Sequence, residues 1–220
     1  MIKPILGYWN IRGLAEPIRC LLHYKEVDFE DKRYVFGTNE WSNEKLNLEL
    51  QFPNLPYYME GDVKLTQSTT IMRYLGHKYG LVGKDDKQRL LVSLTEQQIV
   101  DFRTNLVNLC YSNNYESMKG NFIKKIPDQM KLWEKFLGNR KYLVGDNVAY
   151  VDFIAYETFD WFRLFYKDSL HGCPNLQIYQ DRMKNLPELQ DYFNSPRYKK
   201  WPIFSAVAKF GCSKEPPEHA

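Results

Sequence analysis

The fold is decided by a stretch near the start of the chain, KPILGYWNIRGLAEPIRCLL, which runs from Lys3 to Leu22. Its first part, up to Tyr8, predicts a strand, and the segment from Asp28 to Val35 predicts a second one. Between them, Pro17 to Leu22 has the apolar spacing of a helix, with proline near the first turn. This order of elements predicts a βαβ unit.

A hairpin and a further helix complete the first region of the chain. Pro56–Met59 and Val63–Leu65 flank the turn sequence Glu60-Gly61-Asp62, which predicts two antiparallel strands. The segment from Gln67 to Tyr79 then has helical periodicity. The first region therefore predicts the order βαβ followed by ββα.

A polar segment, Gly83-Lys84-Asp85-Asp86-Lys87, separates two regions of different character. After it the strand signals vanish, and helical periodicity predicts helices at residues 88–113, 118–137, 150–166 and 175–194. We therefore expect two domains: an α/β domain over residues 1–82, a linker over 83–89, and an all-helical domain over 90–220.

The composition excludes several classes of protein. Hydrophobic residues make up 44% of the chain and charged residues 26%, and no apolar run approaches membrane-spanning length, so we expect a soluble protein without a membrane partner. The first residues lack the features of a secretory signal, which predicts a cytoplasmic protein. The net charge of +3 comes from 30 basic and 27 acidic residues without a basic stripe, so we expect no nucleic-acid partner.

The potential metal ligands and reactive thiols are scattered. The four cysteines form no C-x-x-C pair and the four histidines have no metal-ligand spacing, so we expect neither a metal site nor a dithiol motif. A cysteine-dependent redox enzyme needs a thiol at the end of the first strand or the start of the first helix. Tyr8 stands at that strand end, and Cys20 lies within the helix.

The end of the first strand carries the run Gly7-Tyr8-Trp9-Asn10-Ile11-Arg12-Gly13, with two aromatic residues and a loop between glycines. In open α/β sheets, ligands gather at this end of the strands. A Tyr-Trp pair at a strand end is, taken alone, more often core packing than catalysis. Both interpretations stay open at this point.

Six segments, colinear across both domains, resemble a mu-class glutathione transferase. They are residues 5–14 (ILGYWNIRGL), 52–57 (FPNLPY), 66–68 (TQS), 71–75 (IMRYL), 150–153 (YVDF) and 202–205 (PIFS). The resemblance covers nearly the whole chain. It implies an α/β, thioredoxin-like N-terminal domain followed by an all-α C-terminal domain, the glutathione transferase fold, in a homodimer.

The implied activity is conjugation of the glutathione thiolate to small hydrophobic electrophiles, a detoxification reaction with glutathione as co-substrate and no metal. Tyr8 matches the catalytic tyrosine of the family. A thiol with an ordinary pKa near 8.5 is only a few per cent ionised at pH 7. A hydrogen bond from the Tyr8 phenol to the thiolate contributes about 1.5–3 kcal/mol, roughly one to two pKa units, while the tyrosine keeps its proton.

The resemblance also assigns contacts to the rest of glutathione. Gln67 and Ser68, at a helix start, match residues that bind the γ-glutamyl carboxylate, with simple helix capping as the alternative. Leu55 precedes a proline that is cis in the family, and its backbone is left free to pair with the cysteinyl segment. The other matching positions are Asn54 and Pro56 beside it, Trp41 and Lys45 at the glycyl carboxylate, Asp101 reaching the amine bound in the other subunit, and Trp9 and Leu14.

An apolar pocket is expected beside the thiol, because the substrates of the family are hydrophobic. Tyr111 matches the second tyrosine of the family, placed to hydrogen-bond an oxygen that gains negative charge during attack. The matching pocket residues are Trp9, Ile11, Leu14, Val107, Phe204 and Ser205. Core packing is the alternative for most of them.

The chain departs from the mu-class pattern at two places. Only three residues separate Gly37 from Trp41, whereas the family has a longer loop that supplies an arginine beside the glutathione carboxylate. Ala149 stands where the family has Ser or Thr at a helix start, which removes a capping bond with a typical value of about 1 kcal/mol. Asp152 is still expected to accept a hydrogen bond from the Ala149 amide.

Assembly depends on two further matches. Phe52 matches an aromatic residue that projects into the helical domain of the partner subunit, with packing inside its own subunit as the alternative. Arg73 matches a residue near the two-fold axis, where like charges need stacking or acidic partners. The alternative function is a non-enzymatic member of the same fold, either ligand-binding or structural.

Overall fold

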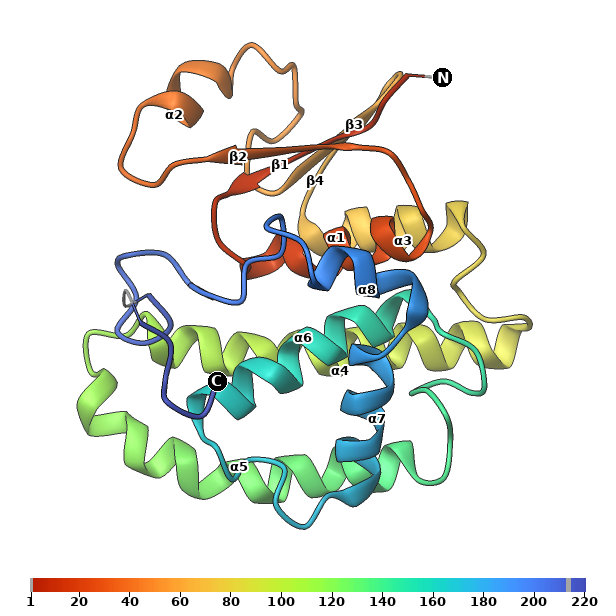
Figure 1. Ribbon diagram of the computed structural model, residues 1–220, viewed down its shortest axis with the longest axis vertical. Helices are drawn as coiled ribbons and strands as arrows, with labels where there is room; N and C mark the ends of the chain where they lie inside the picture. The colour runs from red at the N-terminus through yellow and green to blue at the C-terminus, as the bar shows by residue number, and fades with distance from the viewer. Residues whose placement is uncertain (1, 213–214) are drawn as a thin grey trace.

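The computed structural model describes residues 2–212 and 215–220. A small sheet lies at one end of the molecule and a bundle of long helices at the other (Figure 1). The sheet has four strands in the order β2-β1-β3-β4. They are β1 (Ile5–Trp9), β2 (Glu30–Tyr34), β3 (Tyr57–Glu60) and β4 (Val63–Thr66).

The pairing of these strands confirms the predicted βαβ and ββα units. Strand β1 pairs in parallel with β2 and antiparallel with β3, which pairs antiparallel with β4. Helices α1 (Glu16–Tyr24) and α3 (Ser68–Lys78) pack against each other on the face of the sheet that is turned toward the helical bundle (Figure 1). The α/β region thus presents its helices to the second domain.

Two short elements of the first domain were not predicted. The 3-10 turn η1 (Gly13–Ala15) precedes α1, and the helix α2 (Glu40–Glu44) follows β2. Neither is long enough to show a full period of apolar residues, so hydrophobic periodicity could not detect them. Helix α2 stands apart from the bundle, on the far side of the sheet (Figure 1).

The second domain is all-helical, as predicted, with α6 at its centre. Of the 16 residues of α6, 14 are buried, and this helix packs against α4, α7, α1 and α3. The helices of this domain are α4 (Asp86–Cys110), α5 (Tyr115–Leu137), α6 (Tyr150–Phe165), α7 (Pro174–Lys184) and α8 (Pro187–Phe193).

Two helices differ from their predicted ranges. Helix α4 begins two residues before the predicted start at residue 88, because Asp85 caps it by accepting a hydrogen bond from the Gln88 amide over 2.8 Å. The single helix predicted at 175–194 is two helices, since Pro187 lacks an amide proton and starts a new helix. No helix of the described residues has both the length and the apolar character needed to cross a bilayer.

The start of α6 is held without a capping hydroxyl. The Ala149 amide donates to Asp152 Oδ2 over 2.8 Å, as predicted, and the Leu143 amide donates to Oδ1 over 2.9 Å. Tyr179 adds a hydroxyl bond to the same carboxylate over 3.1 Å. Burial raises the pKa of Asp152 to about 6, although these donors act in the opposite direction.

Candidate functional site

Three neighbouring strands bring several predicted site residues to one edge of the sheet. Gly7, Tyr57 and Thr66 lie side by side in the register of β1, β3 and β4. The next residue beyond each of them along that direction is Tyr8, Pro56 and Gln67, respectively. The sheet therefore gathers three segments that are far apart in the sequence.

Tyr57 organises this edge. A Cβ atom on Gly7 would lie 2.1 Å from the Tyr57 ring, so only glycine leaves room for it. The Trp41 ring stacks on the Tyr57 ring with a centroid distance of 6.1 Å. This contact brings Trp41 beside the Leu55-Pro56 segment. Lys45 lies one turn further along the chain, half-buried, and has no ion pair with a described residue.

The Tyr8 phenol is buried at the end of β1. Its side chain is 6% exposed, and its oxygen accepts a hydrogen bond from the Leu14 amide over 3.2 Å. Burial raises the pKa of Tyr8 above its ordinary value of 10, while the Leu14 amide and the charges of Arg19 and Arg103 act in the opposite direction. The phenol therefore keeps its proton at neutral pH and can donate it in a hydrogen bond.

Gly13 allows the loop after β1 to come this close to Tyr8. Its φ of +48° lies in the left-handed region, and a Cβ atom at this position would lie 2.7 Å from the Tyr8 hydroxyl. Any other residue would both strain the backbone and push the phenol aside. Gly13, which ends the run that begins at Gly7, is therefore needed for Tyr8 to take this position.

The same loop is fixed from the other end of the chain. The Arg12 and Gly13 amides donate to the carbonyls of Pro202 and Ile203, each over 3.1 Å. The buried Arg12 guanidinium also donates two hydrogen bonds, of 2.9 and 2.7 Å, to the Glu157 carboxylate of α6. The loop between Tyr8 and α1 is therefore held by the second domain.

Tyr111, Phe204 and Ser205 form a cluster beside this loop. The Ser205 amide donates to the Tyr111 hydroxyl over 3.0 Å, and the two side-chain oxygens lie 3.1 Å apart. The Phe204 ring meets the Tyr111 ring edge-on at 5.8 Å. Tyr111 is 39% exposed, so the second predicted tyrosine is open to solvent, with Val107 one turn before it on α4.

Gln67 has an unusual backbone conformation at the start of α3. Its φ of 71° lies in the left-handed region, which is sparsely populated by residues other than glycine. Its side chain makes no capping hydrogen bond, so the capping alternative is not what the structure shows. The amides of the first turn of α3, beginning at Ser68, have no partner within the helix. A helix start of this kind is suited to bind an anion.

The backbone at Leu55 differs from the expectation. The peptide bond between Leu55 and Pro56 is cis, as the family resemblance implies. The Leu55 amide donates to Asn54 Oδ1 over 2.9 Å, so one of the two backbone groups of Leu55 that were expected to be free is bonded to the neighbouring side chain. A ligand backbone that pairs with this amide has to displace the Asn54 side chain. Asparagine side chains commonly accept such bonds from a nearby backbone amide.

Two predicted residues are exposed to solvent in the single chain. Asp101 is exposed on α4 without an ion pair to a described residue, and Phe52 is 73% exposed. The alternative that Phe52 packs within its own subunit is therefore wrong. Arg73 has the acidic partner that its position requires: it donates to Glu96 over 2.9 and 2.8 Å.

Arg103 was missed by the sequence analysis. Its side chain is buried on α4, makes no hydrogen bond or ion pair with another described residue, and exerts its charge on Tyr8. Burial lowers the pKa of Arg103 to about 10, so it remains a cation at neutral pH. Its spacing could have indicated it, since Arg103, Val107 and Tyr111 follow one another at four-residue intervals on one face of α4.

The potential metal ligands and the thiols are dispersed in the part of the chain that the structure describes. No group of three or more His, Cys, Asp or Glu side chains in this part of the chain is placed to hold a metal ion. All four cysteines are free, and three of them are buried. Burial raises the pKa of Cys20, which opposes thiolate formation in the helix after Tyr8.

Comparison with protein families matches both domains. Residues 4–77 match the model of the glutathione S-transferase N-terminal domain, and residues 100–196 match that of the glutathione S-transferase C-terminal domain. The two matches lie on the two regions that the structure separates.

Individual relatives match over nearly the full chain. The chain is 44% identical to glutathione S-transferase Mu 1 of Rattus norvegicus over 212 residues, covering 94% of this chain and 97% of the relative. It is also 44% identical to a glutathione S-transferase of Dermatophagoides pteronyssinus over 215 residues, covering 91% and 98%. Among solved structures, glutathione S-transferase Blo t 8 superposes with a TM-score of 0.89 at 32% identity, covering 94% of this chain and 99% of that one.

Proposed function

The chain belongs to the mu class of the glutathione S-transferase family, and we propose that Tyr8 activates the glutathione thiol for attack on small hydrophobic electrophiles. The observation that carries this role is the state of the phenol. Its oxygen already accepts a bond from the Leu14 amide, and its raised pKa keeps the proton in place. The free O–H is available to a thiolate bound at the strand end.

The proposed glutathione site extends along the sheet edge from Tyr8. The γ-glutamyl carboxylate binds at the start of α3, where Gln67 and Ser68 offer unbonded amides. The cysteinyl backbone lies against Leu55, Pro56 and Asn54. Trp41 and Lys45 contact the glycyl carboxylate, with the unpaired Lys45 ammonium supplying the positive charge that the shortened loop after Gly37 lacks, and Trp9 and Leu14 complete the site.

The proposed electrophile pocket lies between the loop after β1 and the second domain. Its walls come from Ile11, Val107, Phe204 and Ser205. Tyr111 is partly exposed and close to Ser205, so its hydroxyl can turn toward a substrate oxygen that gains negative charge.

A homodimer in the cytoplasm is part of the same proposal. Exposed Asp101 on α4 has no ion-pair partner among the described residues, and it would reach the glutathione amine bound in the other subunit. We propose residues 1–82 as the glutathione-binding domain, 83–89 as the linker region and 90–220 as the domain that contributes the electrophile pocket.

The test is Tyr8→Phe, with thiolate absorbance of bound glutathione followed against pH. Loss of the phenolic bond should raise the pKa of the bound thiol by roughly one to two units and reduce turnover at neutral pH. Tyr111→Phe is the matched control, because it removes a hydroxyl from the electrophile side and should leave the thiol titration unchanged.

Unchanged thiol titration and unchanged turnover in Tyr8→Phe would exclude the role of Tyr8. An intact wild-type protein that binds glutathione and turns over no chloronitrobenzene, epoxide, enone or peroxide would favour the non-enzymatic, ligand-binding alternative.

A further inference from the structure

Helix α2 carries two of the proposed glutathione contacts, yet it has little packing of its own. Trp41 lies within the helix and Lys45 follows its last residue. None of residues 40–44, all of which the structure describes, is buried, and the helix stands apart from the bundle (Figure 1). A helix of five residues is too short to be stable by itself in water. Its position is therefore set by contacts with the sheet.

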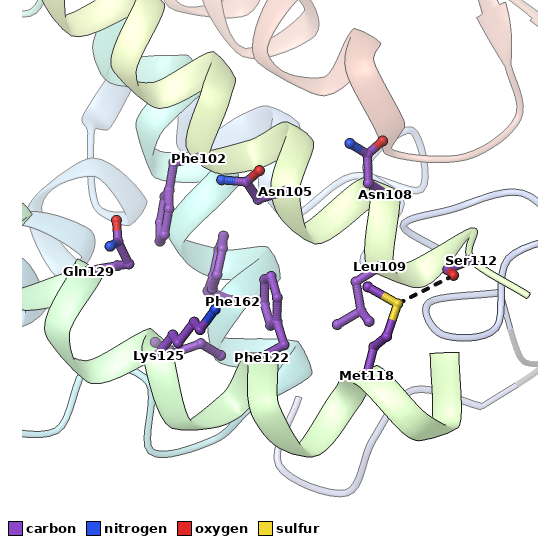
Figure 2. A pocket seen from close by; sticks show the side chains of 11 residues that line it. Phe102, Asn105, Asn108, Leu109, Ser112, Met118, Phe122, Lys125, Gln129 and Phe162 are labelled. Carbon is purple, nitrogen blue, oxygen red and sulfur yellow. Dashed lines mark hydrogen bonds between the residues drawn. The ribbon is translucent and has the colours of Figure 1, made fainter. Parts of the chain in front are cut away.

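The aromatic side chains that meet α2 differ from those inside the helical domain. Between α4 and α5, the rings of Phe102, Phe122 and Phe162 line a cavity and offer only apolar contact (Figure 2). At the sheet, Tyr34 and Tyr57 are 2% and 1% exposed, and their hydroxyls lie 3.0 Å apart. Because buried hydroxyls need hydrogen-bond partners, these two rings can fix the direction of a neighbouring element as well as its distance.

A chain of hydrogen bonds connects the sheet to α2. The Tyr34 hydroxyl donates its one proton to Glu44 Oε2 over 2.9 Å, so the Tyr57 hydroxyl is the donor to the Tyr34 oxygen. The Lys32 ammonium forms an ion pair with the other oxygen of the same carboxylate. Burial, followed by the bonds with Tyr57 and Glu44, raises the pKa of Tyr34 above its ordinary value of 10. The phenol keeps its proton at neutral pH, and the chain of bonds stays intact.

The same two tyrosines hold the Trp41 ring. It stacks on the Tyr57 ring with planes inclined by 20°, and it meets the Tyr34 ring edge-on with a centroid distance of 5.4 Å. The Lys45 amide donates to the Trp41 carbonyl over 2.9 Å, and Lys45 directly follows the anchored Glu44 in the chain. Both proposed contacts with the glycyl carboxylate thus depend on where the helix is anchored.

From this arrangement we infer that Tyr34 and Glu44 are positioning residues, which hold α2 against the sheet and thereby set the preference for glutathione over γ-glutamylcysteine. The inference rests on the proposed function, in which Trp41 and Lys45 contact the glycyl carboxylate. The dipeptide has the same thiol and the same γ-glutamyl group but lacks the glycine. A helix released from the sheet therefore weakens the binding of the tripeptide alone, because ordering the helix then opposes that contact.

The experiment compares the two thiols as substrates, with 1-chloro-2,4-dinitrobenzene as the electrophile. Tyr34→Phe keeps the buried ring and removes the hydroxyl that binds Glu44. We expect the KM for glutathione to rise about fivefold, the effect of one lost hydrogen bond, while kcat stays unchanged. For γ-glutamylcysteine, kcat/KM should keep its wild-type value, so the preference for the tripeptide falls about fivefold.

Tyr58→Phe is the matched control. Tyr58 is also buried in the sheet, but its hydroxyl donates to Glu60 over 3.0 Å instead of to α2, so this variant should keep the wild-type preference. Glu44→Ala removes the same bond from the side of α2, where the carboxylate is partly exposed, and tests the inference even if Tyr34→Phe does not fold. It should lower the preference at least as much, and the double variant should be no worse, since both changes act on one bond.

Three results would overturn the inference: a wild-type preference in both Tyr34→Phe and Glu44→Ala, an equal loss of kcat/KM for the two thiols in these variants, or a wild-type protein that uses the two thiols equally well. An equal loss would indicate damage to the whole site instead of to its glycyl end. A wild-type protein that conjugates neither thiol would instead contradict the proposed function, so the two failures are distinguishable.

Discussion

Hydrogen-bond direction decides the chemistry at the residue scale. The Tyr8 oxygen accepts from a backbone amide, and its O–H remains available to donate to a ligand. The environment of the ring adds positive charge without a direct contact, since both Arg19 and Arg103 lower the pKa of Tyr8 against the larger effect of burial. A developing thiolate next to this phenol lies in the same field.

Arg103→Met should therefore raise the pKa of the bound glutathione thiol, by less than Tyr8→Phe does and by about half a unit, because a buried cation is lost while the phenolic bond stays. Thiolate absorbance against pH measures it. Arg89→Met removes the same charge from an exposed position of the same helix and should leave the titration unchanged. Equal titrations in wild type and Arg103→Met would show that this cation does not act on the thiol.

At the scale of elements, the hydrogen bonds at the start of helix α6 can be tested by a single substitution. Helix α6 begins at Tyr150, whose amide donates to the Leu81 carbonyl, and the Asp152 carboxylate accepts from the Ala149 amide just before the helix. The Asp152 amide itself bonds only the Ala149 carbonyl, over 3.0 Å. A serine hydroxyl at position 149 could accept from that amide and complete the reciprocal arrangement.

Ala149→Ser should raise the unfolding midpoint by about 2–4 °C, the shift that roughly 1 kcal/mol produces in a chain of this size. Differential scanning calorimetry measures it. Ala206→Ser, at an exposed position outside the helices, makes the same substitution without a helix start and should be neutral. A midpoint that is unchanged or lower in Ala149→Ser would mean that the existing donors already satisfy this helix start.

Hydrophobic periodicity in the sequence was sufficient to predict the strands and the long helices, because their buried residues recur every two or every three to four positions. It was not sufficient for the site. The bond between Arg12 and Glu157 joins residues 145 positions apart, the left-handed Gln67 has no signature in composition, and the Asn54 side chain takes the Leu55 amide through a local bond. Family resemblance supplied the site residues, whereas Arg103 needed the three-dimensional structure to reveal that it is buried and unpaired.

At the scale of the whole molecule, the single chain leaves the large apolar side chain of Phe52 exposed to solvent. Phe52 is 73% exposed in the segment that precedes the Leu55-Pro56 bond. A large exposed ring is a candidate anchor of an interface, where truncation often costs 2 kcal/mol or more, roughly thirtyfold in affinity. Exposed Asp101 belongs to the same expectation, since it forms no ion pair with any residue that the structure describes.

Phe52→Ser should shift the protein from dimer toward monomer and weaken glutathione binding, because the monomer lacks the second subunit's aspartate. Sedimentation velocity over a dilution series, with glutathione titration in parallel, measures both effects. Ile2→Ser changes another strongly exposed apolar residue and should stay dimeric. Normal assembly and normal glutathione affinity in Phe52→Ser would rule out this residue as the anchor.

The backbone bonds from Arg12 and Gly13 to the carbonyls of Pro202 and Ile203 also have a consequence for biosynthesis. The ribosome makes the first domain early, and N-terminal domains generally fold first. Yet the loop that positions Tyr8 is completed by residues that lie 190 positions later in the chain. A nascent chain can therefore hold a folded sheet and still lack a finished site, so we expect the site to be completed only after Pro202 and Ile203 have left the ribosome.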